Sequence, residues 1–262
     1  MLSKTVNLGM NLALMCALVG CGMLPTPAPA PTPTPIIIIQ LIKATYMPPT
    51  ATLTPAPTST ATPRPSSTPD LAATQESADQ QALIQKLFDG DFISTTNWRH
   101  DSLISYSDEW AKLGWYSWKP VPSSTSADFI IRTDVSWESA SNTPDDSGCG
   151  FVFREQPNKD HYVIYIAMNG YLQAAHNLSS NWVNMGDAYY GKGSLSAKHN
   201  LTLVVSGNTF SVLVDDKFIR KYSGFKDKLT SGELAYTVIS GTNKDFGTRC
   251  QFENTQLWTN PD

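Results

Sequence analysis

The sequence predicts an all-β fold, an antiparallel β-sandwich preceded by a short helix and a disordered stalk. Apolar and polar residues alternate with a period of two in several runs, which is typical of strands buried on one face. These runs cover residues 129–138, 149–153, 163–167, 201–205 and 210–214. Turn-forming residues separate the runs about every ten residues, and this spacing favours a sandwich or jelly roll. Ser206-Gly207-Asn208-Thr209 and Asp215-Asp216 are two such predicted turns.

The first 20 residues have the pattern of an export signal. A short positive segment ending at Lys4 precedes the apolar stretch Leu8–Val19, which is shorter than the ~20 residues that span a bilayer. Leu18-Val19-Gly20-Cys21 resembles the lipobox of bacterial lipoproteins, which implies cleavage before Cys21 and acyl chains on that residue. We therefore expect an extracytoplasmic protein that Cys21 anchors in the lipid bilayer, at the cell membrane or cell surface. The alternatives are an ordinary signal peptide with an incidental Cys21, or an uncleaved anchor.

Residues 21–69 are predicted to form a Thr/Pro-rich stalk. Residues 25–69 hold 13 of the 18 prolines, and proline fixes φ and lacks the N–H that helices and sheets require. The stalk would act as a semi-rigid spacer. The apolar run Ile36–Ile42 interrupts it, and could rest on a bilayer, dock on the domain or pair as a strand. Residues 70–89 are predicted to form a short helix with Asp70 as its cap and Gly90 as its end.

Residues 90–262 resemble a known domain family. The middle strands of concanavalin A-like (laminin G-like) domains are similar to Gly148–Arg154, Tyr162–Ile166 and Asn200–Val205. The C-terminal end of those domains is similar to Phe252–Trp258. The resemblance implies a jelly roll, and relatives include the 3-keto-disaccharide hydrolase type and carbohydrate-active modules. Asp215-Asp216 and Glu253 depart mildly from the residues that the family often has at those positions.

The cysteines predict a disulfide. Cys16 would leave with the signal peptide and Cys21 would be acylated, so Cys149 and Cys250 remain. A pair of cysteines outside the cytoplasm is most simply a disulfide, and the alternative is two buried free thiols.

The charge balance indicates no nucleic-acid partner. The formal net charge is −4 and the sequence pI is ≈ 5.5, without a cluster of Lys and Arg. Proteins that bind nucleic acids usually carry a basic patch that neutralises phosphates.

No catalytic set is predicted. Glucanases of the family carry Glu-x-Asp-x-x-Glu on one strand, a pattern that this sequence lacks. The remaining candidates are expected at the surface: Glu138, Glu155, Glu233 and Glu253 as solvated charges, and His100, His161, His176 and His199 as surface residues. We therefore expect a domain that is not an enzyme.

Two groups of residues are candidates for ligand binding. Asp145 and Asp146 lie in an oxygen-rich loop that could hold Ca²⁺ but supplies only part of the six to eight oxygens that calcium requires; such a loop is also typical of a turn. No other cofactor is expected. Trp182, Tyr189 and Tyr190 lie near turn residues and could form an exposed sugar-binding surface. In residues 115–118 the alternation predicts at least one buried ring.

These features favour a tethered, non-catalytic domain that binds carbohydrate or another cell-envelope ligand. The alternatives are a hydrolase or lyase acting on glycans, and a structural or adhesive module that contacts protein. A fold alone does not separate these functions.

Overall fold

The computed structural model describes residues 71–122, 124–223 and 229–261, all within one compact unit, Pro65–Asp262. The expected signal peptide, Cys21, the 21–69 stalk with Ile36–Ile42, and Asp70 lie outside the described residues. In the described part of the chain, no helix is both long and apolar enough to cross a membrane.

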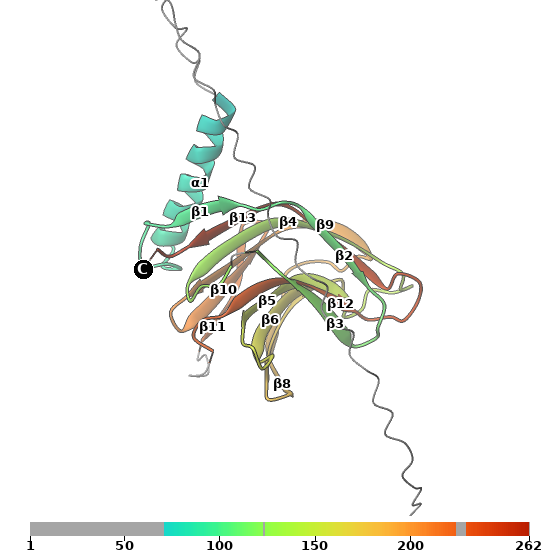
Figure 1. Ribbon diagram of the computed structural model, residues 1–262. Helices are drawn as coiled ribbons and strands as arrows, with labels where there is room; N and C mark the ends of the chain where they lie inside the picture. Colours follow the sequence, from blue (N-terminus) through green and yellow to red (C-terminus); the bar gives the residue numbers. More distant parts are fainter. Residues whose placement is uncertain (1–70, 123, 224–228, 262) are drawn as a thin grey trace, which may run out of the picture. The chain divides into compact units, whose positions relative to one another are not determined.

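The described chain forms two antiparallel sheets and one helix, α1 (Leu71–Asp89), so the predicted β-sandwich is confirmed (Figure 1). Sheet A has the strand order β1-β13-β4-β9-β10-β11, with β2 also paired to β13, and sheet B has the order β3-β12-β5-β6-β7-β8. The strands of sheet A are β1 (Arg99–Ser102), β2 (Tyr106–Trp110), β4 (Phe129–Ser139), β9 (Ser196–Ser206), β10 (Thr209–Val214), β11 (Lys217–Ser223) and β13 (Thr248–Thr259). The strands of sheet B are β3 (Trp115–Pro120), β5 (Gly148–Glu155), β6 (His161–Ala167), β7 (Tyr171–Leu178), β8 (Asn181–Tyr189) and β12 (Glu233–Ser240).

Both predicted turns are tight hairpins. Gly207 has φ 54° between β9 and β10, and Asp215 and Asp216 have φ 50° and 61° between β10 and β11. Two-residue hairpin turns with positive φ at both positions match the twist of the flanking strands, and Asp tolerates that conformation better than most residues. The pair Asp215-Asp216 therefore preserves the hairpin without glycine.

The main core lies between the inner faces of the two sheets. Alternate residues of β4, including Ile131, Val135 and Trp137, share one buried cluster with Phe151 and Phe153 of β5. The predicted disulfide joins Cys149 of β5 to Cys250 of β13, and both residues are fully buried. It therefore crosslinks sheet B to sheet A through the core.

The helix covers part of the outer face of sheet A. Leu83, Ile84 and Leu87 form a stripe at helical spacing that packs in one cluster with Ile130 and Trp258. Gly90 donates its N–H to the Lys86 carbonyl at 3.1 Å, at the predicted helix end. Since Ile130 faces outward while Ile131 faces the core, the helix explains why both faces of β4 are apolar there.

Removal of the crosslink tests its contribution to stability. Replacing both Cys149 and Cys250 by Ala opens a loop with a sequence separation of 101 residues in the unfolded chain. The chain-entropy model then predicts a loss of about 4–5 kcal/mol in the free energy of unfolding. Chemical denaturation of the oxidised wild type and of the double variant measures the difference. Equal free energies of unfolding would contradict a stabilising role for the disulfide.

Candidate functional site

The floor of the outer face of sheet B has two positions without side chains at its centre. Gly148 and Gly150 occupy outward positions of β5, while Cys149 and Phe151 between and beside them face the core. A Cβ at Gly150 would overlap the backbone oxygen of Ile164 on β6, and a Cβ at Gly148 would overlap that of Ile166. Only glycine therefore allows β6 to approach β5 this closely.

Aromatic side chains from opposite edges of sheet B meet above this floor. The ring centroids of Tyr116 on β3 and Trp182 on β8 lie 5.4 Å apart, although four strands separate β3 from β8 in the sheet. Adjacent strands are about 4.8 Å apart, so a flat sheet would hold these rings much farther from each other. The outer face of sheet B is therefore concave.

A buried histidine fixes the position of the Tyr116 ring. His161 is fully buried, and its Nδ1 lies 2.7 Å from the backbone oxygen of Lys159. A carbonyl oxygen only accepts, so Nδ1 carries the proton and Nε2 accepts from the Tyr116 hydroxyl at 2.7 Å. Burial lowers the pKa of His161 and raises that of Tyr116 to about 12, which keeps both groups neutral.

Glu155 is a second buried polar residue beneath the aromatic rings of this face. It is 4% exposed, and its two oxygens accept hydrogen bonds from Trp118 Nε1 at 2.8 Å and from Lys159 Nζ at 2.7 Å. The prediction that Glu155 is a solvated charge was therefore wrong, because the indole and ammonium donors replace its water. The surface prediction was also wrong for His161 and His176, which are buried on β6 and β7.

A hollow of ≈ 510 Å³ opens beside the meeting point of the two edges. Its lining includes the rings of Tyr116, Tyr165 and Trp182 and the carboxylates of Asp145 and Asp146. The Trp182 side chain is 46% exposed there. The structure therefore places the predicted aromatic residue Trp182 and the predicted acidic pair in one hollow, which their separation in the sequence did not indicate.

The loop between β4 and β5 holds both carboxylates in place. Asp145 Oδ1 accepts the Ser147 N–H at 2.8 Å, and a Cβ at Gly241 would lie 2.5 Å from Asp145 Cγ. Asp146 Oδ1 accepts from Asn169 Nδ2 at 2.9 Å and from Gln173 Nε2 at 3.5 Å. All of these donors are neutral. Neither carboxylate forms an ion pair with any residue that the structure describes.

The same loop was the candidate calcium site. Within 71–122, 124–223 and 229–261, no group of three or more His, Cys, Asp or Glu residues is arranged to hold a metal ion. Asp145 and Asp146 are thus two carboxylates that bind amide donors, and the loop brings no third acidic or imidazole ligand to them.

The structure divides the predicted aromatic trio. Tyr189 is 64% exposed but lies at the other end of β8, where it packs against Tyr171 at 5.5 Å between ring centroids. Tyr190 turns inward, and its hydroxyl donates to the Ala167 carbonyl at 2.7 Å. Only Trp182 of the three therefore belongs to the hollow.

Tyr116 and Trp118 are the residues that the sequence interpretation missed as site residues. It predicted a buried ring within residues 115–118, but Trp115 is 57% exposed and Tyr116 and Trp118 are only partly buried, on the outer face of sheet B. The alternation correctly places Tyr116 and Trp118 on one side of β3. It does not reveal which side, because the edge strand could pack either face inward.

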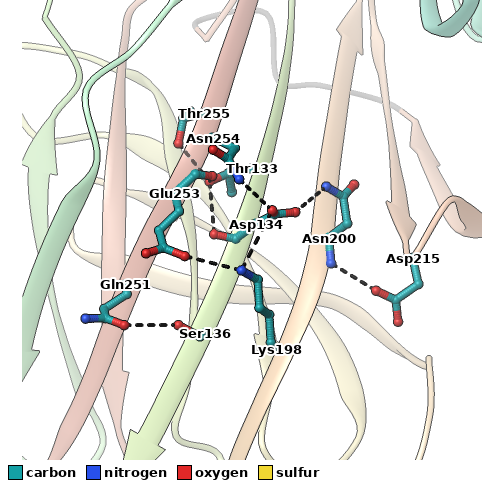
Figure 2. A network of polar contacts seen from close by, with 10 residues as sticks. All are labelled: Thr133, Asp134, Ser136, Lys198, Asn200, Asp215, Gln251, Glu253, Asn254 and Thr255. Atoms are coloured by element: carbon teal, nitrogen blue, oxygen red, sulfur yellow. Dashed lines mark hydrogen bonds and ion pairs between the residues drawn. The ribbon is translucent and has the colours of Figure 1, made fainter. Parts of the chain in front are cut away.

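The exposed outer face of sheet A is different, because two of its carboxylates share a cationic partner (Figure 2). Asp134 accepts from Asn200 and Asn254, each at 3.0 Å, and Lys198 pairs with Glu253 at 3.2 Å. Burial alone would raise the pKa of Asp134, but these amide donors and the nearby cations outweigh it and lower the pKa. This network spans β13, β4 and β9, and it stabilises the sheet surface because Lys198 lies near both Asp134 and Glu253.

A second hollow, of ≈ 470 Å³, lies between α1 and sheet A. Three glutamines of α1 line it together with Trp98 and His100. Of the two indole rings in this hollow, Trp258 is only 2% exposed and packs in the cluster beneath the helix, and Trp98 is half-buried against the same cluster. The hollow on sheet B therefore offers the more accessible aromatic surface.

Comparisons with known proteins find solved structures of similar fold. No protein-family model matches the chain, and no curated protein matches it. Similar solved structures include a carbohydrate-binding module from Bacillus subtilis, at 12% identity and TM-score 0.45, covering 60% of this chain and 94% of that one. A β-glucanase of Bacillus licheniformis has 11% identity and TM-score 0.41, covering 62% and 92%. Sheep galectin-11 has 9% identity and TM-score 0.37, covering 56% and 98%. The likeness concerns the fold alone.

The buried histidine predicts a pH dependence of stability. The folded pKa of His161 is below its ordinary value of 6.5, so the unfolded chain takes up the proton first as the pH falls. The free energy of unfolding of the wild type should therefore decrease below pH 6.5, and a His161→Gln variant should lack this component. Denaturant titrations over a pH series measure both curves. Parallel curves would show that His161 is not held neutral.

Proposed function

We propose that this chain is an exported lipoprotein whose β-sandwich binds carbohydrate, without catalysis, in the hollow of sheet B. One observation carries the proposal: the accessible ring of Trp182 and the ring of Tyr116 stand over a hollow that also presents two carboxylates. Sugars bind proteins by stacking their apolar faces on aromatic rings while fixed polar groups accept from their hydroxyls.

The arrangement of the carboxylates supports binding rather than hydrolysis. Glycoside hydrolysis uses two carboxyl groups that flank the scissile bond. Asp145 and Asp146 are consecutive residues of one loop, so they approach a ligand from one side. Glu155, the buried carboxylate of the same face, has both oxygens engaged by Trp118 and Lys159.

A glycan array of the chain, followed by calorimetry on the best ligand, tests this site. Trp182→Ala should weaken binding by about 2 kcal/mol, roughly thirtyfold, because the stacking surface is lost. Tyr189→Ala is the matched control: it removes another exposed ring from the same strand, about 23 Å away at ~3.3 Å per residue. Its affinity should stay at the wild-type value.

Three results would count against the proposal. These are the absence of glycan binding, an equal loss in both variants, and release of cleaved products during the assay. The last would favour the hydrolase or lyase alternative.

Membrane tethering is the second part of the proposal. It rests on the lipobox-like Leu18–Cys21 and is supported by the disulfide, since disulfides persist in oxidising compartments outside the cytoplasm. Cys21→Ala should abolish incorporation of a radiolabelled fatty acid and move the protein out of the membrane fraction. Cys16→Ala, which leaves the expected acceptor intact, serves as the control. Equal labelling of the Cys21→Ala variant and the wild type would refute the anchor.

A further inference from the structure

The charge of the hollow specifies its ligand more narrowly than the aromatic rings do. Asp145 and Asp146 both line the hollow, and the lining contains no cationic side chain. Their hydrogen-bond donors are a backbone N–H and two side-chain amides, which are neutral. A sugar that enters the hollow therefore meets two negative charges that the surrounding protein leaves available.

The negative charge of the acidic loop affects a tyrosine that lines the hollow. The ring of Tyr165 lies on the floor, and burial, together with the charge of Asp146, raises the pKa of its hydroxyl. Asp145 rests directly against Gly241, where any side chain would displace its carboxylate. Packing thus holds the negative charge beside the rings.

The chain segment that leads into the hollow already holds one ammonium group on an aromatic ring. Lys112 Nζ lies 3.6 Å from the centroid of the Trp115 ring, and the adjacent Leu113 and Gly114 line the hollow. Lys112 forms no ion pair with Asp145 or Asp146. An ammonium group that is placed between an aromatic face and a carboxylate gains from both interactions.

Resting on the proposed function, we infer that the hollow selects glycans with free amino groups, such as oligomers of unacetylated glucosamine. The apolar face of such a sugar stacks on Trp182 and Tyr116, and its ammonium group meets the carboxylates of Asp145 and Asp146. N-acetylation removes the positive charge, and an acidic sugar is repelled.

The test compares tetramers of glucosamine, N-acetylglucosamine and galacturonate by calorimetry with the full-length chain in detergent, at mildly acidic pH. The glucosamine tetramer should bind at least about tenfold more tightly than the N-acetylated one, and the galacturonate tetramer should not bind. High salt should reduce the preference, because it screens the exposed carboxylates. This salt arm uses only the wild type and so does not depend on whether any variant folds.

A matched pair of double variants assigns the preference to the acidic loop. In the Asp145→Asn/Asp146→Asn double variant, the affinities for the glucosamine tetramer and the N-acetylglucosamine tetramer should lie within about threefold of each other. Binding of the N-acetylated tetramer should not be lost. Asp215→Asn with Asp216→Asn makes the same change in charge in the hairpin between β10 and β11, and it should retain the wild-type preference.

The outcomes separate this inference from the proposed function. Equal or tighter binding of the N-acetylated tetramer would overturn the inference while carbohydrate binding stands. The inference is also overturned if the preference survives in the Asp145→Asn/Asp146→Asn variant or in high salt, or if tetralysine binds as tightly as the glucosamine tetramer. Failure of all three glycans to bind would overturn the inference, whereas the proposed function is overturned only if the glycan array shows no binding at all.

Discussion

The close approach of β5 and β6 at Gly148 and Gly150 is the constraint on which the candidate site depends. A side chain at either position would overlap the backbone of β6, so the two strands would have to separate. The same glycines place no side chain of their own on the outer face, and they lie in register with Thr237 and Ile239 of β12 and, beyond them, Trp118 and Tyr116 of β3. The aromatic rings can therefore reach across β12 and β5 to His161 on β6.

Polar groups buried beneath these rings hold the concave face together. Burial of a carboxylate or an imidazole is unfavourable unless its hydrogen bonds are satisfied. Here Glu155 binds Trp118 and Lys159, while His161 binds Tyr116 and the Lys159 backbone. Each bond orients an aromatic ring or the turn before β6, so one set of interactions fixes the ring positions that a ligand would meet. The disulfide acts separately, by joining β5 to β13 through the core.

The sequence predicts the sandwich well because period-two alternation, tight turns and paired cysteines are local or countable signals. It predicts Asp145, Asp146 and Trp182 as candidates but not their meeting, because that depends on how far sheet B curls. The error at Glu155 has the same origin: its partner Trp118 lies 37 positions earlier in the chain and reaches it across the strand order β3-β12-β5. Tyr189 and Tyr190 show the converse, since neighbours in sequence point to opposite faces of the sheet.

The most direct test of the site is the tryptophan indole ¹H–¹⁵N spectrum during titration with the tightest-binding glycan. The chain has seven tryptophans, which report on both hollows and on the core. Binding on sheet B predicts that the Trp182 indole signal moves most, with a smaller change at Trp118, whose N–H is held by Glu155. The signals of Trp98 and Trp258, beside the hollow under α1, should stay in place. Shifts confined to Trp98 and Trp258 would contradict a binding site on the concave face of sheet B.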